Sequence, residues 1–362
     1  MQQPSRNALT RRLSSLQKKF PRWGADGILF TDICNIRYLT GFTGSEGFLM
    51  AGRDEARLLV DGRYTAQART EVYGISVCEV ADKLQGLEQA ASKMNLKRIG
   101  FEPSRMSVGD YNRLSALLKN AKLIPLEEEL RMLRACKDRA EIVLMKQAAA
   151  IAAKAVRELA CALRPGWTER EAALFLETQA RRAGAEQVAF ETIVASGENG
   201  AFPHAQPSRR KIRHGDFVVV DFGVRFHGYC SDETCTFAIG ELTRGQKNAY
   251  RAVKRAHDEA IASIQAGADA ARIDALARRT LGKKHSRYFV HSTGHGVGLE
   301  VHEAPRLAPS SRDVLRSGMT LTVEPGIYYP GLWGIRIEDT VLVKKNGCEL
   351  ITSMSKDLIT IE

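Results

Sequence analysis

Two aspartates in a predicted β-hairpin are the first residues whose types and spacing point to chemistry. The segments Phe217–Phe222 and Tyr229–Ile239 are apolar, β-branched or alternating in hydrophobicity, and are predicted strands. With a turn over 223–228 centred between Phe226 and His227, Asp221 lies directly opposite Asp232. Facing side chains of an antiparallel pair have Cβ atoms roughly 4.5–5.5 Å apart.

Two carboxylates held that close among apolar residues repel each other and lose their hydration. A divalent cation between them removes both costs, and an all-oxygen pair suits a hard or borderline metal. In isolation the pair has a simpler interpretation, in which one or both aspartates lie at a strand end in water. The rest of the chain favours the metal.

A second hairpin repeats this arrangement. Glu324 and Glu338 flank the turn YYPGLWG, and a turn centred on Gly331 places them face to face. Arg336 is two residues from Glu338 and is predicted on the same face of its strand. Two acidic hairpins predict a cage for two cations, because each facing pair of carboxylates is unfavourable alone.

His295 lies in GHGVGLEVHE, where three glycines let the backbone approach whatever the imidazole ring contacts. It completes a predicted set of five metal ligands: Asp221, Asp232, His295, Glu324 and Glu338. Sharing two of the acids would hold two ions roughly 3.5–4 Å apart, with a water between them deprotonated near neutral pH. Histidine with carboxylates and without thiolate points to manganese, cobalt or zinc.

Three more histidines, His204, His291 and His302, stand near this set in the sequence and are predicted to contact substrate. The simpler interpretation of each is a surface or core histidine with its own partners. The remaining histidines have no such context and are predicted to lie on the surface: His214, His227, His257 and His285.

Helices and strands in two similar halves are predicted to position these residues. An Ala-rich helix over 141–163 is followed by a helix that Thr168 and Glu171 open with a capping box. Thr243 and Gln246 open the corresponding long helix to about residue 264, and a shorter helix follows over 269–281. The glycines that separate the helices of each pair, Gly166 and Gly267, stand 101 residues apart. We interpret this as one α+β domain of two αα-β halves.

The preceding residues are predicted to form an α/β domain. A helix is expected over 1–20, and short apolar runs from residue 26 onward alternate with helices over 65–73, 84–95 and 107–118. The Gly-rich stretch 38–50 is predicted as strand–turn–strand. We therefore expect an α/β two-domain chain divided into residues 1–127 and 128–362.

Composition limits the classes of protein. The chain has 362 residues, of which 44% are hydrophobic and 26% charged, as in a soluble globular protein. It has no membrane-length apolar run and no apolar h-region at its start, so a cytoplasmic protein with no membrane partner is expected. Seven cysteines without a CxxC spacing argue against disulfides and zinc knuckles. The net charge of +11 is spread along the chain, so no nucleic-acid partner is expected.

The segments VVVDFG…CSDETCTF, HSTGHGVGLEVHE, LTVEPGIYYP and GIRIEDT resemble, in order and spacing, the metal motifs of the pita-bread metallopeptidases. The similarity is greatest to the Xaa-Pro aminopeptidase and prolidase branch. It covers residues 130–362, and GFTGSEGFLM and VDGRYTAQA resemble that branch's creatinase-type N-terminal domain. It implies a creatinase-like α/β domain followed by a pseudo-symmetric pita-bread α+β domain.

The resemblance also implies roles for the residues. Asp221 would bind one metal, Asp232 and Glu338 would bridge, and His295 and Glu324 would bind the other metal. Glu324 would accept a proton from the bridging water. A list of catalytic residues follows from the family's pattern: His204 near a proline pocket, His291 and His302 at the scissile carbonyl and leaving group, Glu324, and Arg336 beside the bridging glutamate. Cys235 departs from the pattern, because relatives commonly have arginine there.

The function implied is removal of the N-terminal residue before proline by a homodimer with two metal ions, manganese first among them. The alternative is an Xaa-Pro dipeptidase, for which Arg306 could bind the free carboxylate of a dipeptide. More remote alternatives are a metal-independent creatinase-like hydrolase and a non-catalytic binding module. Both should have lost metal ligands, whereas all five residues are present.

Overall fold

A computed structural model describes residues 5–362, so the first four residues of the helix predicted over 1–20 lie outside it. The rest of that prediction corresponds to two helices, α1 (Arg6–Gln17) and α2 (Phe20–Trp23). The chain divides into two compact units, one ending at Arg134 and the next beginning at Ala135. Sequence reasoning placed the domain boundary after residue 127.

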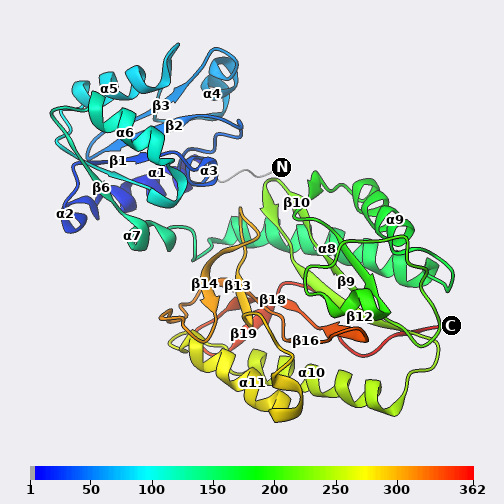
Figure 1. The fold of residues 1–362 in the computed structure, drawn as a ribbon. Helices are drawn as coiled ribbons and strands as arrows, with labels where there is room; N and C mark the ends of the chain where they lie inside the picture. Colours follow the sequence, from blue (N-terminus) through cyan, green and yellow to red (C-terminus); the bar gives the residue numbers. More distant parts are fainter. Residues whose placement is uncertain (1–4) are drawn as a thin grey trace. The chain divides into compact units, whose positions relative to one another are not determined.

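The first unit is an α/β sandwich around a six-stranded sheet (Figure 1). Strand order is β4-β3-β2-β1-β5-β6, and β2 alone runs antiparallel to its neighbours. Its core lies between the sheet and the helices α5 and α6 and includes Leu29, Met50 and Ile99. Its remaining elements are β1 (Gly27–Phe30), α3 (Ile33–Thr40), β2 (Phe48–Gly52), β3 (Ala56–Val60), α4 (Thr65–Glu71), β4 (Ser76–Glu79), α5 (Lys83–Lys93), β5 (Arg98–Phe101), a 3-10 turn (Pro103–Arg105), α6 (Val108–Leu117), β6 (Lys122–Pro125) and α7 (Glu127–Arg131).

The strand–turn–strand predicted over 38–50 is wrong in its first half. Residues 38–40 are the last turn of α3, which begins after Asp32, whose carboxylate accepts a hydrogen bond from the Cys34 N–H. Gly41 ends the helix with a φ of 79°, a left-handed conformation typical of helix C-termini. The tyrosine and leucine of YLTGF are common in strands, but the N-cap at Asp32, six residues before Tyr38, starts a helix that includes them.

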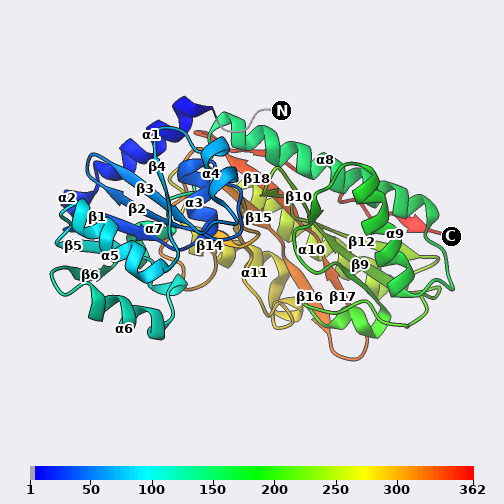
Figure 2. The ribbon, with the colours of Figure 1, turned by 90° about the horizontal axis from the view of Figure 1, so that it is seen from above.

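The second unit places four long helices around its strands, with α8 and α9 on one side and α10 and α11 on the other (Figure 1). A view from above shows α9 beside the long α8 (Figure 2). The two predicted capping positions are confirmed, because Thr168 and Thr243 cap α9 and α10 through complete capping boxes. The carboxylate of Asp269, where the shorter helix was predicted to begin, caps α11. The helices are α8 (Arg139–Ala162), α9 (Glu169–Arg182), α10 (Arg244–Ala262) and α11 (Ala270–Ser286).

The strands of the second unit form four sheets, with orders β11-β10-β7, β20-β12-β9-β8, β14-β13-β15-β18-β19 and β16-β17. Small residues on α8, among them Ala152, let that helix pack closely against Val218, Val220 and Phe237 of the second sheet. The strands are β7 (Gln187–Val188), β8 (Ile193–Ser196), β9 (Phe217–Phe222), β10 (Val224–Phe226), β11 (Tyr229–Cys230), β12 (Glu233–Ile239), β13 (Gly294–Gly296), β14 (Glu303–Leu307), β15 (Thr320–Val323), β16 (Gly326–Tyr329), β17 (Trp333–Arg336), β18 (Asp339–Val343), β19 (Cys348–Leu350) and β20 (Thr360–Ile361), with a 3-10 turn at Gly197–Ala201.

The predicted internal symmetry is visible in hydrogen bonds. Gly166 N–H donates to the Ile212 carbonyl at 2.9 Å, and Gly267 N–H donates to the Leu315 carbonyl at 2.8 Å. Both glycines have positive φ, 93° and 88°, so both positions require a residue without a Cβ. Each half therefore ties the loop between its two helices to the segment that precedes its acidic strand pair.

No helix in the described part of the chain combines the length and apolarity that crossing a membrane requires.

Candidate metal centre

The first acidic hairpin has a different register from the predicted one. Asp221 pairs with Thr234, not with Asp232, which lies just before β12 begins at Glu233. The prediction that the two aspartates face each other directly is therefore wrong by two residues. Because the shift is even, Asp232 stays on the same side as Asp221, and both line one cavity.

The turn explains the shift. The hairpin reverses at His227 and Gly228, both with positive φ, 46° and 81°, which fits a two-residue type I′ turn. Strands β10 and β11 continue the hairpin up to that turn, so the loop is shorter than the predicted 223–228. The His-Gly dipeptide was the available signal, since glycine at the second central position favours this turn.

The second hairpin has the predicted register. Val323 pairs with Asp339 on one side of the acids, and Gly326 pairs with Arg336 on the other. Both pairs agree with a turn centred on Gly331. Glu324 and Glu338 occupy the interval between these pairs, at the crossing from the five-stranded sheet to β16 and β17.

The histidine and the acids meet in one place. His295 Nε2 lies 3.3 Å from Glu324 Oε1 and 3.7 Å from Asp232 Oδ2. Asp232, His295 and Glu338 also have ligand atoms that all lie within 4.8 Å of one another, the one group of three or more in the second unit's described residues close enough to share an ion. The fifth predicted ligand, Asp221, lines the same cavity.

The protonation of His295 suits a metal ligand. Its Nδ1 donates to the Gly296 carbonyl at 3.1 Å, which leaves the Nε2 lone pair directed toward carboxylate oxygens. Burial lowers the pKa of His295 to about 4, with a further contribution from nearby His302, so the ring is neutral near pH 7. A neutral Nε2 whose lone pair faces carboxylates is suited to bind a cation, which would take the place of the protons on these acids.

The acids of the centre lead to the same conclusion. Burial raises the pKa of Glu324 to about 8, and it raises the pKa values of Asp232 and Glu338 well above their usual range. The neighbouring carboxylates add to the shifts of Asp232 and Glu338 by repulsion. Asp221 Oδ1 is buried and has no hydrogen-bond partner. The residues therefore fit divalent cations, which would neutralise the acids and bind the free oxygen.

We expect cation binding to release protons and to strengthen as pH rises. Glu324, with its pKa near 8 before binding, holds a proton at neutral pH that a cation must displace. The affinity should rise by up to about tenfold per pH unit for each proton released, until the acids of the centre are ionised without the cation. Calorimetric titration with Mn²⁺ in buffers of different ionisation enthalpy would count the protons. A pH-independent affinity would contradict this arrangement of acids.

Three threonines that sequence reasoning missed form hydrogen bonds with the predicted metal ligands. Thr234 Oγ1 donates to Glu338 Oε2 at 2.6 Å, and Thr340 Oγ1 donates to the Asp232 carbonyl at 2.8 Å. Thr322 Oγ1 accepts from the His295 N–H at 3.1 Å. Each threonine lies two residues from an acid, on the same strand face, and that spacing was the available signal.

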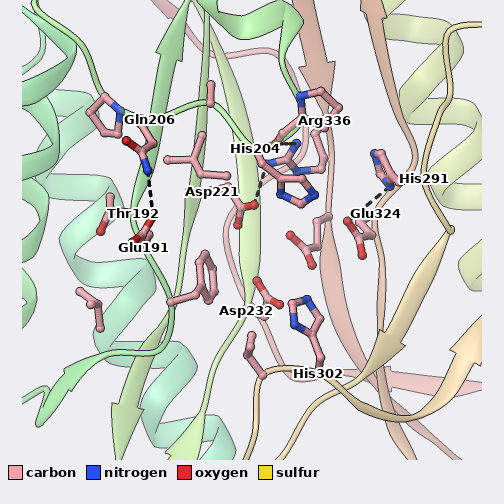
Figure 3. Close-up of a pocket in the computed structure, with 18 of the residues that line it drawn as sticks. Glu191, Thr192, His204, Gln206, Asp221, Asp232, His291, His302, Glu324 and Arg336 are labelled. Carbon is pink, nitrogen blue, oxygen red and sulfur yellow. Dashed lines mark hydrogen bonds and ion pairs between the residues drawn. The ribbon is translucent and has the colours of Figure 1, made fainter.

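The three further histidines are brought to the same cavity (Figure 3). The His302 ring lies 4.3 Å from the His295 ring, centroid to centroid, and is exposed on the cavity wall. His204 is also exposed. His291 is half-buried, 3.8 Å from Glu324.

Tyr328 is a site residue that sequence reasoning missed. Arg336 Nη1 donates to its hydroxyl at 2.6 Å, and that hydroxyl lies 2.9 Å from His291 Nε2. Because His291 Nδ1 donates to the Ser292 carbonyl, Nε2 accepts the tyrosine proton. Arg336 Nη2 also donates to Asp221 Oδ2 at 2.6 Å, so one chain of hydrogen bonds joins Asp221 to His291.

Tyr328 lies four residues after Glu324, on the same face of its hairpin, which is the signal that could have identified it. A Cβ at Gly326 would lie 2.6 Å from the Tyr328 hydroxyl, so the glycine between the two residues makes room for the tyrosine. Burial raises the pKa of Tyr328 to about 12, so the hydroxyl keeps its proton.

Replacing Tyr328 by phenylalanine should lower kcat/KM about tenfold with the metal content unchanged. The ring is kept, whereas His291 and Arg336 each lose a partner, a cost of about 1–3 kcal/mol in a buried site. Tyr329→Phe is the matched control, because its hydroxyl contacts His285 outside the cavity. Equal kinetics for the two variants would mean that the Tyr328 hydroxyl does not hold His291 in place.

The cavity has a volume of about 1230 Å³ and extends from the acids to an apolar wall. Figure 3 shows Asp221, Asp232 and Glu324 directed inward, with Glu191, Thr192 and Gln206 at the far side. The wall includes Leu174, Val188, Phe190, Ile193 and Val290. The cavity therefore offers a ligand polar groups on one side and an apolar wall on the other.

Two residues lie near the centre, on the side of its strands that is turned away from the cavity. Cys235 is buried and faces away from the cavity, 3.8 Å from Lys356 Nζ. His257 is also buried, only 2% exposed, so the prediction that it lies on the surface is wrong. It lies 3.2 Å from Asp339 and 3.1 Å from Asp258, and these carboxylates raise its pKa although burial alone would lower it. Asp258 is its neighbour in α10, but nothing in the local sequence signalled Asp339.

Comparisons with known proteins agree with this geometry. Residues 143–345 match the model of metallopeptidase family M24, and residues 12–136 match the creatinase/prolidase N-terminal domain. An Xaa-Pro dipeptidase from Bacillus anthracis is 38% identical, with a TM-score of 0.94 over 98% of this chain and 100% of that one. An X-Pro aminopeptidase from Thermotoga maritima is 36% identical, with a TM-score of 0.86 over 93% and 98% of the two chains. An Xaa-Pro dipeptidase from Pyrococcus horikoshii is 35% identical over 92% of this chain and 94% of that protein.

Proposed function

This chain belongs to metallopeptidase family M24, with a creatinase/prolidase N-terminal domain, and we propose that it hydrolyses the bond between an N-terminal residue and proline. The observation that carries the proposal is the meeting of Asp232, His295 and Glu338 around a space that can hold a cation. Names of similar proteins agree with the substrate, since they include Xaa-Pro dipeptidases and an X-Pro aminopeptidase.

Five residues would hold two divalent ions: Asp221, Asp232, His295, Glu324 and Glu338. Bound there, the ions would polarise the scissile carbonyl and supply a nucleophile at neutral pH. Glu324 is the proposed proton acceptor, because a bound cation would displace its proton and leave a carboxylate beside the nucleophile. Manganese is the proposed metal, in a cytoplasmic homodimer.

The remaining polar residues would orient the peptide. His302 is exposed beside His295, and burial lowers its pKa, so its neutral ring can donate to the substrate carbonyl. His291 is held by Tyr328 and Ser292, which fixes its ring at the cavity wall. Arg336 neutralises Asp221 and holds Tyr328. His204, on the other side of the cavity, is the proposed neighbour of the proline ring.

The experiment that tests the proposal compares peptides on one preparation with measured metal content. Xaa-Pro and Xaa-Pro-Yaa-Zaa peptides should be cleaved before proline, and matched peptides with alanine in place of proline should not. Cleavage that is indifferent to proline would reject the proposal. Absence of stoichiometric Mn²⁺ binding would reject it independently.

Arg306 favours an Xaa-Pro dipeptidase as the second candidate. It is exposed on the cavity wall and makes no ion pair with any residue between 5 and 362, so it is free to bind a carboxylate. Arg306→Gln should raise KM for an Xaa-Pro dipeptide about tenfold, because a charge-assisted bond is worth about 1.5–3 kcal/mol. The KM for a tetrapeptide should change little. Equal effects on both peptides would contradict the carboxylate role.

A further inference from the structure

Lys356 is a buried cation behind the metal centre. Its side chain is 5% exposed, and its Nζ lies 2.5 Å from Glu233 Oε1 and 3.3 Å from Asp339 Oδ1. Glu233 directly follows Asp232, and Asp339 directly follows Glu338. The ammonium therefore pairs with the residues next to two of the proposed metal ligands.

Successive side chains of a strand point to opposite faces. Asp232 and Glu338 line the cavity, whereas Glu233 and Asp339 are directed away from it, to the ammonium. At the start of each of the two strands, β12 and β18, the acid just before the strand thus faces the cavity and the first acid of the strand faces Lys356. On each face two acids are thus paired with positive charge. On the cavity face the partners are the proposed metal ions, and on the opposite face the partner is the ammonium of Lys356.

The strands that Lys356 joins belong to different halves of the domain and to different sheets. Local hydrogen bonds join them at this point, among them the one from Thr234 Oγ1 to Glu338 Oε2. Glu338 N–H donates to the Thr234 carbonyl at 3.2 Å, and Thr340 Oγ1 donates to the Asp232 carbonyl. Since no continuous ladder of hydrogen bonds joins the two strands, their separation depends on such local contacts.

The C-terminal segment holds Lys356 in place from several sides. Tyr250 Oη donates to the Lys356 carbonyl at 2.9 Å, and the Met354 N–H donates to Glu233 Oε1 at 2.9 Å. Thr352 Oγ1 donates to Asp339 Oδ1 at 2.6 Å. Strand β20 then pairs with β12, with Thr360 opposite Ala238. These contacts fix the position of the ammonium, because the C-terminal segment is hydrogen-bonded to the rest of the unit both before and after Lys356.

We propose that Lys356 is a positioning residue that sets the spacing between Asp232 and Glu338, and thereby the affinity for the cations between them. Without an ammonium, Glu233 and Asp339 would repel each other in a site closed to water. Loss of the ammonium's bonds to both carboxylates would let the strands β12 and β18 move apart, and any repulsion between the two acids would add to that movement. The inference rests on the proposed cation site but not on the identity of the peptide substrate.

A charge-balanced double variant, Glu233→Gln/Lys356→Met, tests positioning separately from long-range electrostatics. It removes one negative and one positive charge, so the net charge near the cations stays the same. We expect Mn²⁺ affinity by calorimetry to fall 10- to 100-fold, the usual effect of losing a partner behind a metal ligand. The visible absorption bands of the Co²⁺-loaded protein should also change, because they report ligand geometry. The single variant Lys356→Met should also bind Mn²⁺ more weakly. If the ammonium acted on Mn²⁺ only by long-range charge repulsion, its removal would instead tighten Mn²⁺ binding.

The matched control is Glu349→Gln/Lys344→Met, which removes an exposed Lys–Glu pair in the same unit and should leave affinity and spectrum unchanged. Wild-type affinity and spectrum in Glu233→Gln/Lys356→Met would overturn the proposal. If that variant does not fold, Asp339→Asn/Lys356→Met replaces it. Failure of both to fold would assign Lys356 to the fold as a whole and overturn the positioning role. Failure of the wild-type protein to bind Mn²⁺ would instead reject the proposed function.

Discussion

Asp232→Asn should abolish peptide hydrolysis and leave the fold intact. The side chain is 4% exposed and lies 3.7 Å from His295, where an amide has the same shape but cannot supply the negative charge that a bridging ligand needs. Turnover should fall about a thousandfold or more, since the cations are expected to supply several kcal/mol of the barrier reduction.

Without bound cations, Asp232→Asn should be at least as stable toward unfolding as the cation-free wild-type protein. Burial and neighbouring acids raise the pKa of Asp232, so its ionised form is unfavourable in the folded state above the usual pKa of an aspartate. A neutral amide avoids that cost at neutral pH. The thermal midpoint after chelation, together with bound metal, would check this expectation. Asp357→Asn, which changes an exposed aspartate outside the cavity, is the control. Near-normal turnover in Asp232→Asn would reject the centre.

His302→Ala should lower turnover by about 10²- to 10⁴-fold, the range for removing a group that hydrogen-bonds the reacting atoms or transfers a proton. The ring is exposed on the cavity wall, 4.3 Å from the His295 ring, and lies outside the Asp232–His295–Glu338 group. Its removal should therefore change kcat much more than metal content.

Metal analysis and kinetics on one preparation would separate the two roles of His302. His214→Ala, an exposed histidine outside the cavity, is the control. Loss of the metal from His302→Ala would place this residue among the ligands, contrary to the proposal. Partial burial lowers the pKa of His302, so its neutral form should persist below the usual range of a histidine. At Mn²⁺ concentrations that stay saturating despite weaker binding in acid, activity should therefore not be lost through protonation of His302 in that range.

Local signals in the sequence determined the helices, most strands and the identities of the acids. Capping boxes at Thr168 and Thr243 depend on residues three positions apart, which is why both were predictable. The register of the second hairpin also followed from the spacing of its acids about Gly331. The first hairpin was harder, because a type I′ turn at His227 and Gly228 depends on backbone angles more than on hydrophobic pattern.

The sequence by itself therefore determined which residue types could bind cations and which strand face carries them. Only the tertiary structure decided which distant groups hold them, as in Arg336 with Asp221, 115 residues away, and Lys356 with Glu233, 123 residues away. The physical reason is that spacing and propensity act over a few residues, whereas a buried charge takes whichever partner the packing of both halves brings within reach.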